Sequence, residues 1–177
     1  MAVTTVHDGR TNGLMVLSGG PVGIIPEAPR ASVSITKDNF SHDLVHESGI
    51  FILHVLGSSE ELIDRSINII RILGGSSGRD GDKLGPLRTK TGASGAPILV
   101  DALAYAEVRV TASLDNDENT IFVGDVVAAA RLGAGRSLDV ATAWPKLGAW
   151  TDEYAPRLAA QIDHARELRG RIGQAGS

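Results

Sequence analysis

The residues best suited to hold a ligand stand between positions 76 and 83, in the run SSGRDGDK. Glycine lets a backbone approach an anion closely, serine donates from its hydroxyl, arginine pairs with phosphate through two hydrogen bonds, and lysine adds a point charge. This combination indicates a phosphate-binding loop. A surface loop with solvated charges has the same composition, so the residue types alone leave both interpretations open. The spacing matches neither the P-loop nor GxGxxG, and neither mechanism is invoked.

Two other segments offer groups to a small ligand. Residues 34–41, SITKDNFS, run from a predicted strand end into a predicted helix start, where free backbone N–H groups can meet an anion. Simple capping of that helix by Ser41 explains the same residues without a ligand. Residues 12–20, NGLMVLSGG, place glycines at a strand end, where a flat ring can lie against the backbone. A bulge or tight bend is the ordinary explanation, and the residues do not separate the two.

Other kinds of active site lack their residues. The chain has no cysteine, which excludes disulfides, thiolate nucleophiles and cysteine metal sites. His42 and His46 stand at i, i+4, but no third ligand and no HExxH motif accompany them, so we predict no metal site. GxSxG is also absent, and nothing indicates a nucleophile paired with a base.

The composition is that of one globular domain spanning residues 1–177. Apolar residues make up 42% and charged residues 21%, which is ordinary for a soluble protein. The net charge of -4 and the 4% of aromatic residues argue against a nucleic-acid surface. No apolar run approaches the ~18 residues of a membrane span, and the N-terminus lacks the features of a signal peptide. We therefore expect a cytoplasmic protein that binds neither nucleic acid nor membrane.

Hydrophobic alternation predicts β-strands over the first two thirds of the chain. Asp8-Gly9 is a turn signal between two apolar runs and predicts a hairpin. Residues 31–36 alternate small or polar with apolar side chains, and residues 50–56 form a short apolar run. The β-rich segments 104–114 and 120–130 are joined by an obvious turn, so they predict a long antiparallel hairpin.

The predicted helices are local, except at the C-terminus. A short helix over residues 41–48 should stop at Gly49, and a second should follow the capping-box pair Ser58 and Glu61. A third pattern covers residues of about 151–172. Strands linked by such short helices disfavour a doubly wound parallel sheet, whose crossovers need a dozen or more residues. They favour a closed or nearly closed antiparallel barrel.

Taken in order, the segments resemble the flavin reductase-like family of FMN-binding split β-barrels. The matching stretches are DGRTNGLMV, PRASVSITKDNFSHDLVHESGIFILHVL, SSGRDGDKL, GAPILVDALAYAEVRV and TIFVGDVVAA. They cover residues 1 to about 130. The resemblance implies a mainly β protein with flanking helices, a split antiparallel barrel over residues of about 1–140, a C-terminal helix, and assembly as a homodimer.

The resemblance also assigns residues to the flavin. These are Ser18, Gly19, Ser34, Thr36, Ser41, Ser77, Arg79 and Lys83. Ser77, Arg79 and Lys83 would take the phosphate, and Ser18 with the Gly19 backbone would lie near the isoalloxazine ring. The remaining three would supply hydroxyl or backbone contacts.

The function implied by the resemblance is that of an FMN-binding oxidoreductase. It would be an NAD(P)H-dependent flavin reductase that supplies reduced flavin or electrons to a partner such as a monooxygenase, with FAD or a deazaflavin as alternative cofactors. Hydride transfer requires no side-chain acid or base, so no catalytic residue is assigned.

One departure from the family favours an alternative function. Many members that use a nicotinamide carry histidine before the last long strand, where this chain has Asn119. Asparagine can hydrogen-bond a carboxamide as a nicotinamide contact, but it does not titrate near neutral pH. The alternative is a flavoredoxin-like electron carrier, or a flavin- or deazaflavin-binding protein, without efficient NAD(P)H turnover. A barrel without cofactor that serves as an interaction module is a third reading.

Overall fold

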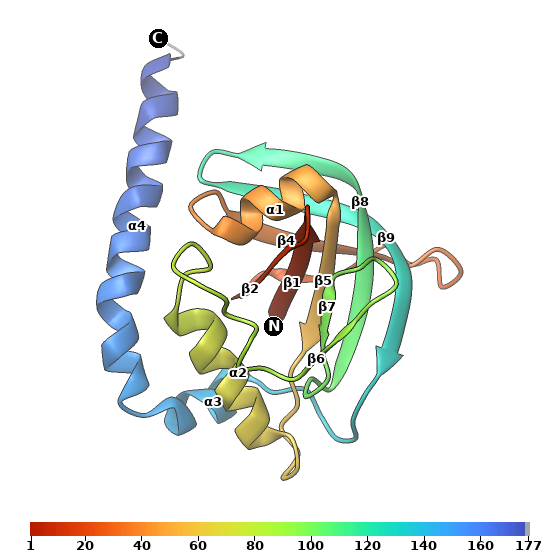
Figure 1. Cartoon of the computed structure of the whole chain (residues 1–177). Helices are drawn as coiled ribbons and strands as arrows, with labels where there is room; N and C mark the ends of the chain where they lie inside the picture. Colours follow the sequence, from red (N-terminus) through yellow and green to blue (C-terminus); the bar gives the residue numbers. More distant parts are fainter. Residues whose placement is uncertain (176–177) are drawn as a thin grey trace.

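The fold is built on one antiparallel sheet of seven strands, in the order β2-β1-β5-β8-β9-β4-β3 (Figure 1). The computed structural model describes residues 1–175, with side-chain burial for residues 1–169. The strands are β1 Ala2–His7, β2 Arg10–Met15, β3 Gly19–Val22, β4 Arg30–Thr36, β5 Ile50–Val55, β8 Ala104–Asn116 and β9 Asn119–Arg131. The hairpin at Asp8-Gly9 and the long β8–β9 hairpin are confirmed.

The sheet curls so that its two edge strands meet. Only residues 16–18 separate β2 from β3, although these strands stand at opposite edges of the sheet. The Val16 N–H donates to the Met1 carbonyl at 2.9 Å, and the Ser34 N–H donates to the Ser18 carbonyl at 3.2 Å. No ladder pairs β2 with β3 within the described residues, so the barrel is split at this seam.

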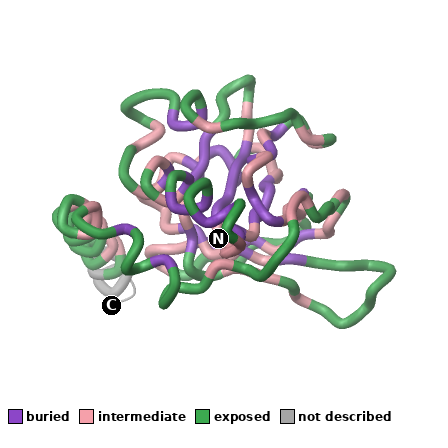
Figure 2. The backbone as a smooth tube through the Cα atoms, turned by 90° about the horizontal axis from the view of Figure 1, so that it is seen from below, coloured by how far each residue is buried: buried purple, intermediate pink, exposed green. Residues whose placement is uncertain are grey.

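The core fills the inside of the curled sheet. Alternate residues of each strand point to the same face, so Val33 and Ile35 are buried while Ser32 and Ser34 are half-buried. The buried cluster comprises Val3, Leu14, Val16, Ala31, Val33, Ile35, Val45, Phe51, Leu53, Val108 and Phe122. Figure 2 shows these buried segments gathered at the centre of the molecule. The prediction of a mainly β, barrel-type fold with flanking helices and a C-terminal helix is confirmed.

The helices are α1 Phe40–Ser48, α2 Ile63–Gly75, α3 Val140–Leu147 and α4 Trp150–Ala175. The stop at Gly49 is confirmed, because this residue has φ of 66° and its N–H donates to the Val45 carbonyl. The capping-box prediction is wrong: α2 begins only at Ile63. The Ser58 hydroxyl instead donates to the Arg136 carbonyl, next to a β-bridge that holds this stretch extended.

Three further elements, β6 Thr89–Thr91, β7 Pro97–Leu99 and α3, lie outside the predicted pattern. β6 follows the 76–83 loop and pairs with β7 in a separate small sheet. α3 begins after Asp139, whose carboxylate accepts a hydrogen bond from the Thr142 N–H. α4 covers the predicted helical segment, although side chains from residue 170 onward lie outside those described. None of the helices in residues 1–175 combines the length and apolarity that a membrane span needs.

Candidate functional site

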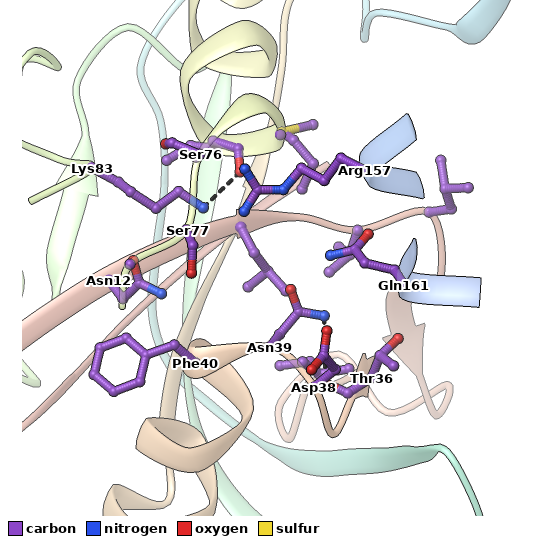
Figure 3. A pocket seen from close by; sticks show the side chains of 18 of the residues that line it. Asn12, Thr36, Asp38, Asn39, Phe40, Ser76, Ser77, Lys83, Arg157 and Gln161 are labelled. Atoms are coloured by element: carbon purple, nitrogen blue, oxygen red, sulfur yellow. Dashed lines mark hydrogen bonds between the residues drawn. The ribbon is translucent and has the colours of Figure 1, made fainter. Parts of the chain in front are cut away.

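A cavity of about 340 Å³ opens where the seam of the barrel, the 76–83 loop and α4 come together (Figure 3). This volume is in the range of small-molecule sites. The predicted residues that line it are Ser18, Ser34, Thr36, Ser77, Lys83 and Asn119. A second hollow of about 420 Å³ also contains Ser18 and Ser34, and Gly19 lines it. The structure therefore brings these seven residues together along one surface, as a bound elongated molecule would require.

One end of the cavity is cationic. Lys83 is only 8% exposed, and its Nζ donates to the Leu73 carbonyl at 2.7 Å. From the opposite side, Arg157 of α4 donates from Nη1 to the Gly75 carbonyl at 2.8 Å. Figure 3 shows the two side chains pointing toward each other across the cavity. Burial, assisted by the Arg157 charge, lowers the pKa of Lys83 to about 8.

No carboxylate of the described side chains lies within 4 Å of either cation, since neither takes part in any ion pair there. Ser76 and Ser77 line the cavity beside them. Buried charges in proteins are ordinarily paired. This end thus fits the anionic tail of a ligand.

The other end of the cavity is polar and uncharged, apart from Asp38. Thr36 and Asn119 face each other across the β4–β9 ladder, and the Thr36 hydroxyl donates to Asn119 Oδ1 at 3.0 Å. Gln161 of α4 lies on the same side (Figure 3). Such groups can hydrogen-bond a polar ring edge or an amide.

Ser41 is buried and does not line the cavity. It is the second residue of α1, whose N-cap is Asn39, and it is 1% exposed. Its hydroxyl accepts a hydrogen bond from Asn12 Nδ2 at 2.9 Å. The Asn12 amide in turn packs against Gly78, where a Cβ would approach Asn12 Nδ2 to 2.6 Å and Oδ1 more closely still. Asn12, which is hydrogen-bonded to Ser41, therefore packs directly against the 76–83 loop.

Arg79 also lies apart from the cavity lining. Its guanidinium is 2.8 Å from Asp43 of α1 and lies 5.4 Å from the centre of the Phe40 ring. The side chain is about half exposed, so the pair with Asp43 is a surface ion pair of small net stability. Its backbone shapes the loop, because the Arg79 N–H donates to the Ser77 hydroxyl at 3.2 Å.

Sequence reasoning missed the residues that α4 and β2 contribute. Asn12, Tyr154, Arg157 and Gln161 all line the cavity. Trp150 stacks on Tyr154, with ring centres 4.9 Å apart, and packs against the backbone of Gly74 and Gly75. An alanine Cβ at either glycine would stand 3.1 Å from that ring. The glycine pair before the loop thus makes room for Trp150. This role of the two glycines could not be predicted from the sequence, because it depends on where α4 packs.

The described residues contain no group of three or more His, Asp or Glu side chains arranged to hold a metal.

Known proteins resemble this chain over the barrel and the loop. The sequence model of the flavin reductase like domain matches residues 1–143. The chain is 32% identical over 119 residues to the high molecular weight rubredoxin of Moorella thermoacetica, covering 67% of this chain and 50% of that protein. It is 29% identical over 133 residues to the ferric-chelate reductase (NAD(P)H) of Archaeoglobus fulgidus, covering 72% of each.

The solved structure of an FMN-binding protein from Thermus thermophilus, with bound p-hydroxybenzaldehyde, superposes with a TM-score of 0.64. The two sequences are 25% identical, and the superposition covers 73% of this chain and 69% of the other. The chain spans only half the length of the rubredoxin it matches. α4 begins at Trp150 and so lies beyond the residues that the family model covers.

Proposed function

The chain belongs to the flavin reductase-like family, and from that premise we propose that it is an FMN-binding, NAD(P)H-dependent flavin reductase. The observation that carries the proposal is the cavity itself, in which Lys83 and Arg157 make a cationic end, while the other end holds Thr36, Asn119 and one carboxylate, Asp38. A bound flavin would supply the redox chemistry, taking up a hydride from NAD(P)H and passing both electrons to an acceptor.

The proposed orientation puts the flavin phosphate at the cationic end. Ser77 and Lys83 would donate to it, while Ser18 and the Gly19 backbone, in the adjoining hollow, would contact the ring. Ser34 and Thr36 line the same cavity on β4 and would meet the ribityl chain. Arg79 remains a proposed phosphate contact, which would require its guanidinium to exchange Asp43 for the ligand. FMN is favoured over FAD because a phosphate monoester carries the larger charge per phosphate.

An electron carrier without efficient NAD(P)H turnover is the second candidate function. Asn119 favours it, because its Oδ1 already accepts a hydrogen bond from Thr36 and the residue cannot act as an acid near neutral pH.

As a reductase, in contrast, the protein would transfer reduced flavin or electrons to a partner such as a monooxygenase.

An absorption spectrum of the purified protein, mass spectrometry of any bound small molecule, and NADH and NADPH oxidation with added FMN or FAD separate these functions. Flavin binding with oxidation of either nicotinamide supports the reductase. Tightly bound flavin without nicotinamide oxidation would contradict the reductase and support the electron carrier. Protein that carries no flavin and does not quench FMN fluorescence would refute both.

We also propose that the protein is a homodimer. Leu17 lines the cavity and is 94% exposed, and Ile24 and Ile25 on the β3–β4 connection are exposed as well. Large apolar side chains that are exposed to this degree are typical of a surface that a partner covers. Sedimentation velocity should give twice the chain mass, and Leu17→Asp should shift the protein toward monomer. A monomeric wild-type protein at micromolar concentration would contradict the proposal.

FMN affinity should decrease above about pH 8. The empty site holds the pKa of Lys83 near 8, whereas a bound phosphate favours the ammonium and raises that pKa, so binding takes up a proton at higher pH. We expect a nearly constant Kd between about pH 6.5 and 7.5, and roughly tenfold weaker binding at about pH 9. Fluorescence titrations at several pH values measure this, with Lys83→Met as the variant whose curve should stay flat.

In the empty protein the same group acts on stability with the opposite sense. Its pKa is lowered from 10.5 on folding, so the unfolded chain binds the proton more tightly. This lysine therefore makes the free energy of unfolding rise between about pH 8 and pH 10.5.

For the binding prediction, a Kd for FMN that stays constant above pH 8 would contradict the placement of Lys83 at the phosphate.

A further inference from the structure

α4 closes one side of the cavity although it lies beyond the family-matched residues. Figure 1 shows this helix standing beside α2 and the 76–83 loop, and Figure 3 shows Arg157 and Gln161 reaching into the cavity from it. It is held along its length by the Arg157 bond to Gly75, by His164 at 3.6 Å from Asp38, and by Arg169 at 3.8 Å from Asp117. These contacts place α4 over the cavity, and because the His164 and Arg169 pairs are largely exposed they hold the helix only weakly.

Both cavity cations attach to the C-terminal end of α2. The last carbonyls of a helix have no partners within the helix and carry a partial negative charge. Here the Ser76 hydroxyl donates a hydrogen bond to the Ile72 carbonyl. Lys83 donates to the Leu73 carbonyl, and Arg157 donates to the Gly75 carbonyl. Each cation spends one hydrogen bond in this way, which leaves two donors on Lys83 and four on Arg157. An anion would otherwise be repelled by this helix end.

Helix capping alone does not account for so much charge. A helix C-terminus is equivalent to about half a negative charge, whereas Lys83 and Arg157 together bring two positive ones. The excess is about +1.5, and no described carboxylate is paired with it. A phosphate monoester carries about −1.5 to −2 at neutral pH, which matches the excess.

We propose that Arg157 and Lys83 together grip the phosphate monoester of the flavin, so that cofactor binding and the docking of α4 strengthen each other. The inference rests on the proposed function, since it takes the ligand to be a flavin. It adds that one phosphate-binding cation, Arg157, comes from α4, outside the family-matched part of the chain. Coupling between two sites is reciprocal, so whatever tightens the helix must also tighten the phosphate.

The test compares FMN with riboflavin, which has the same ring and ribityl chain but no phosphate. Fluorescence titration of wild type, Arg157→Gln and Arg166→Gln gives the six affinities. Arg166 is the matched control, because it lies on the same helix, is exposed, and pairs with Asp163. We expect Arg157→Gln to weaken FMN about tenfold to a hundredfold and to leave riboflavin unchanged. The control should change neither.

Equal weakening of FMN and riboflavin would overturn the proposal, since it would mean a general loss of the cavity, and so would unchanged FMN affinity. If Arg157→Gln does not fold, Arg157→Lys keeps both the helix bond and the charge, and should retain the preference for FMN over riboflavin. A wild-type protein that binds neither compound would instead refute the proposed function.

Hydrogen exchange supplies a readout that is independent of affinity. Amide exchange in α4 around Arg157 should slow when FMN is added and remain unchanged with riboflavin at equal occupancy. Inorganic phosphate alone should slow it at higher concentration. Exchange that responds equally to FMN and riboflavin would show that α4 docking does not depend on the phosphate, and would overturn the coupling.

Discussion

Replacing Lys83 with methionine should weaken FMN binding by about ten- to a hundredfold and leave riboflavin binding unchanged. The substitution removes one charge-assisted hydrogen bond, of about 1.5–3 kcal/mol, at the buried end of the cavity. Methionine keeps most of the apolar stem, so the packing of the loop is preserved. It also removes a buried ammonium whose pKa burial lowers to about 8. The empty protein should therefore be at least as stable as wild type.

Fluorescence titration and urea unfolding measure these two effects separately. Lys146→Met serves as the control, because Lys146 is exposed on α3 and does not line the cavity. An FMN affinity equal to that of wild type would remove Lys83 from the phosphate site. A large loss of stability with an unchanged preference for FMN over riboflavin would show that Lys83 only caps the C-terminal end of α2.

Gly78→Ala should both weaken FMN binding, by about tenfold or more, and destabilise the fold by about 1–3 kcal/mol. A methyl group at this position would overlap the Asn12 amide, which is 3% exposed and bonded to Ser41. The Asn12 amide can move away only by giving up its hydrogen bond to Ser41, so we expect the loop to shift instead and to carry Ser77 and Lys83 with it. A displacement of about an ångström at a binding group is costly.

Gly81→Ala is the matched control in the same loop. A Cβ at Gly81 meets nothing within 4 Å, so this variant should behave as wild type. In an Asn12→Ala background the overlap disappears, and Gly78→Ala should then cost clearly less, which a double-mutant cycle measures through urea unfolding. If Gly78→Ala resembles Gly81→Ala, the contact with Asn12 does not set the loop position.

The strands could be predicted because their signals are local. Alternation in residues 31–36 and the turn at Asp8-Gly9 depend on neighbours a few residues away, and both appear in the structure. The capping box at Ser58 failed for the opposite reason. A β-bridge from the distant residue Ser137 holds that stretch extended, and no local pattern reports such a partner.

The site was predictable only in part for the same physical reason. Residue types identified a loop able to hold phosphate, and its Ser77 and Lys83 do line the cavity. The same reasoning could not distinguish an arginine aimed at a ligand from one bound to Asp43, as Arg79 is. It also could not find Arg157, because nothing near that residue in the chain indicates that its helix returns to the end of α2.

The order in which a ribosome delivers these parts follows from the place of Arg157 on α4. Every strand of the barrel precedes this helix in the chain, and domains begin to form as their N-terminal parts emerge. A nascent barrel would therefore present Lys83 and its loop well before Arg157 arrives. Binding of the cofactor would then be a late step of biosynthesis. Chains truncated before α4 would be released from the ribosome with a weaker affinity for the cofactor.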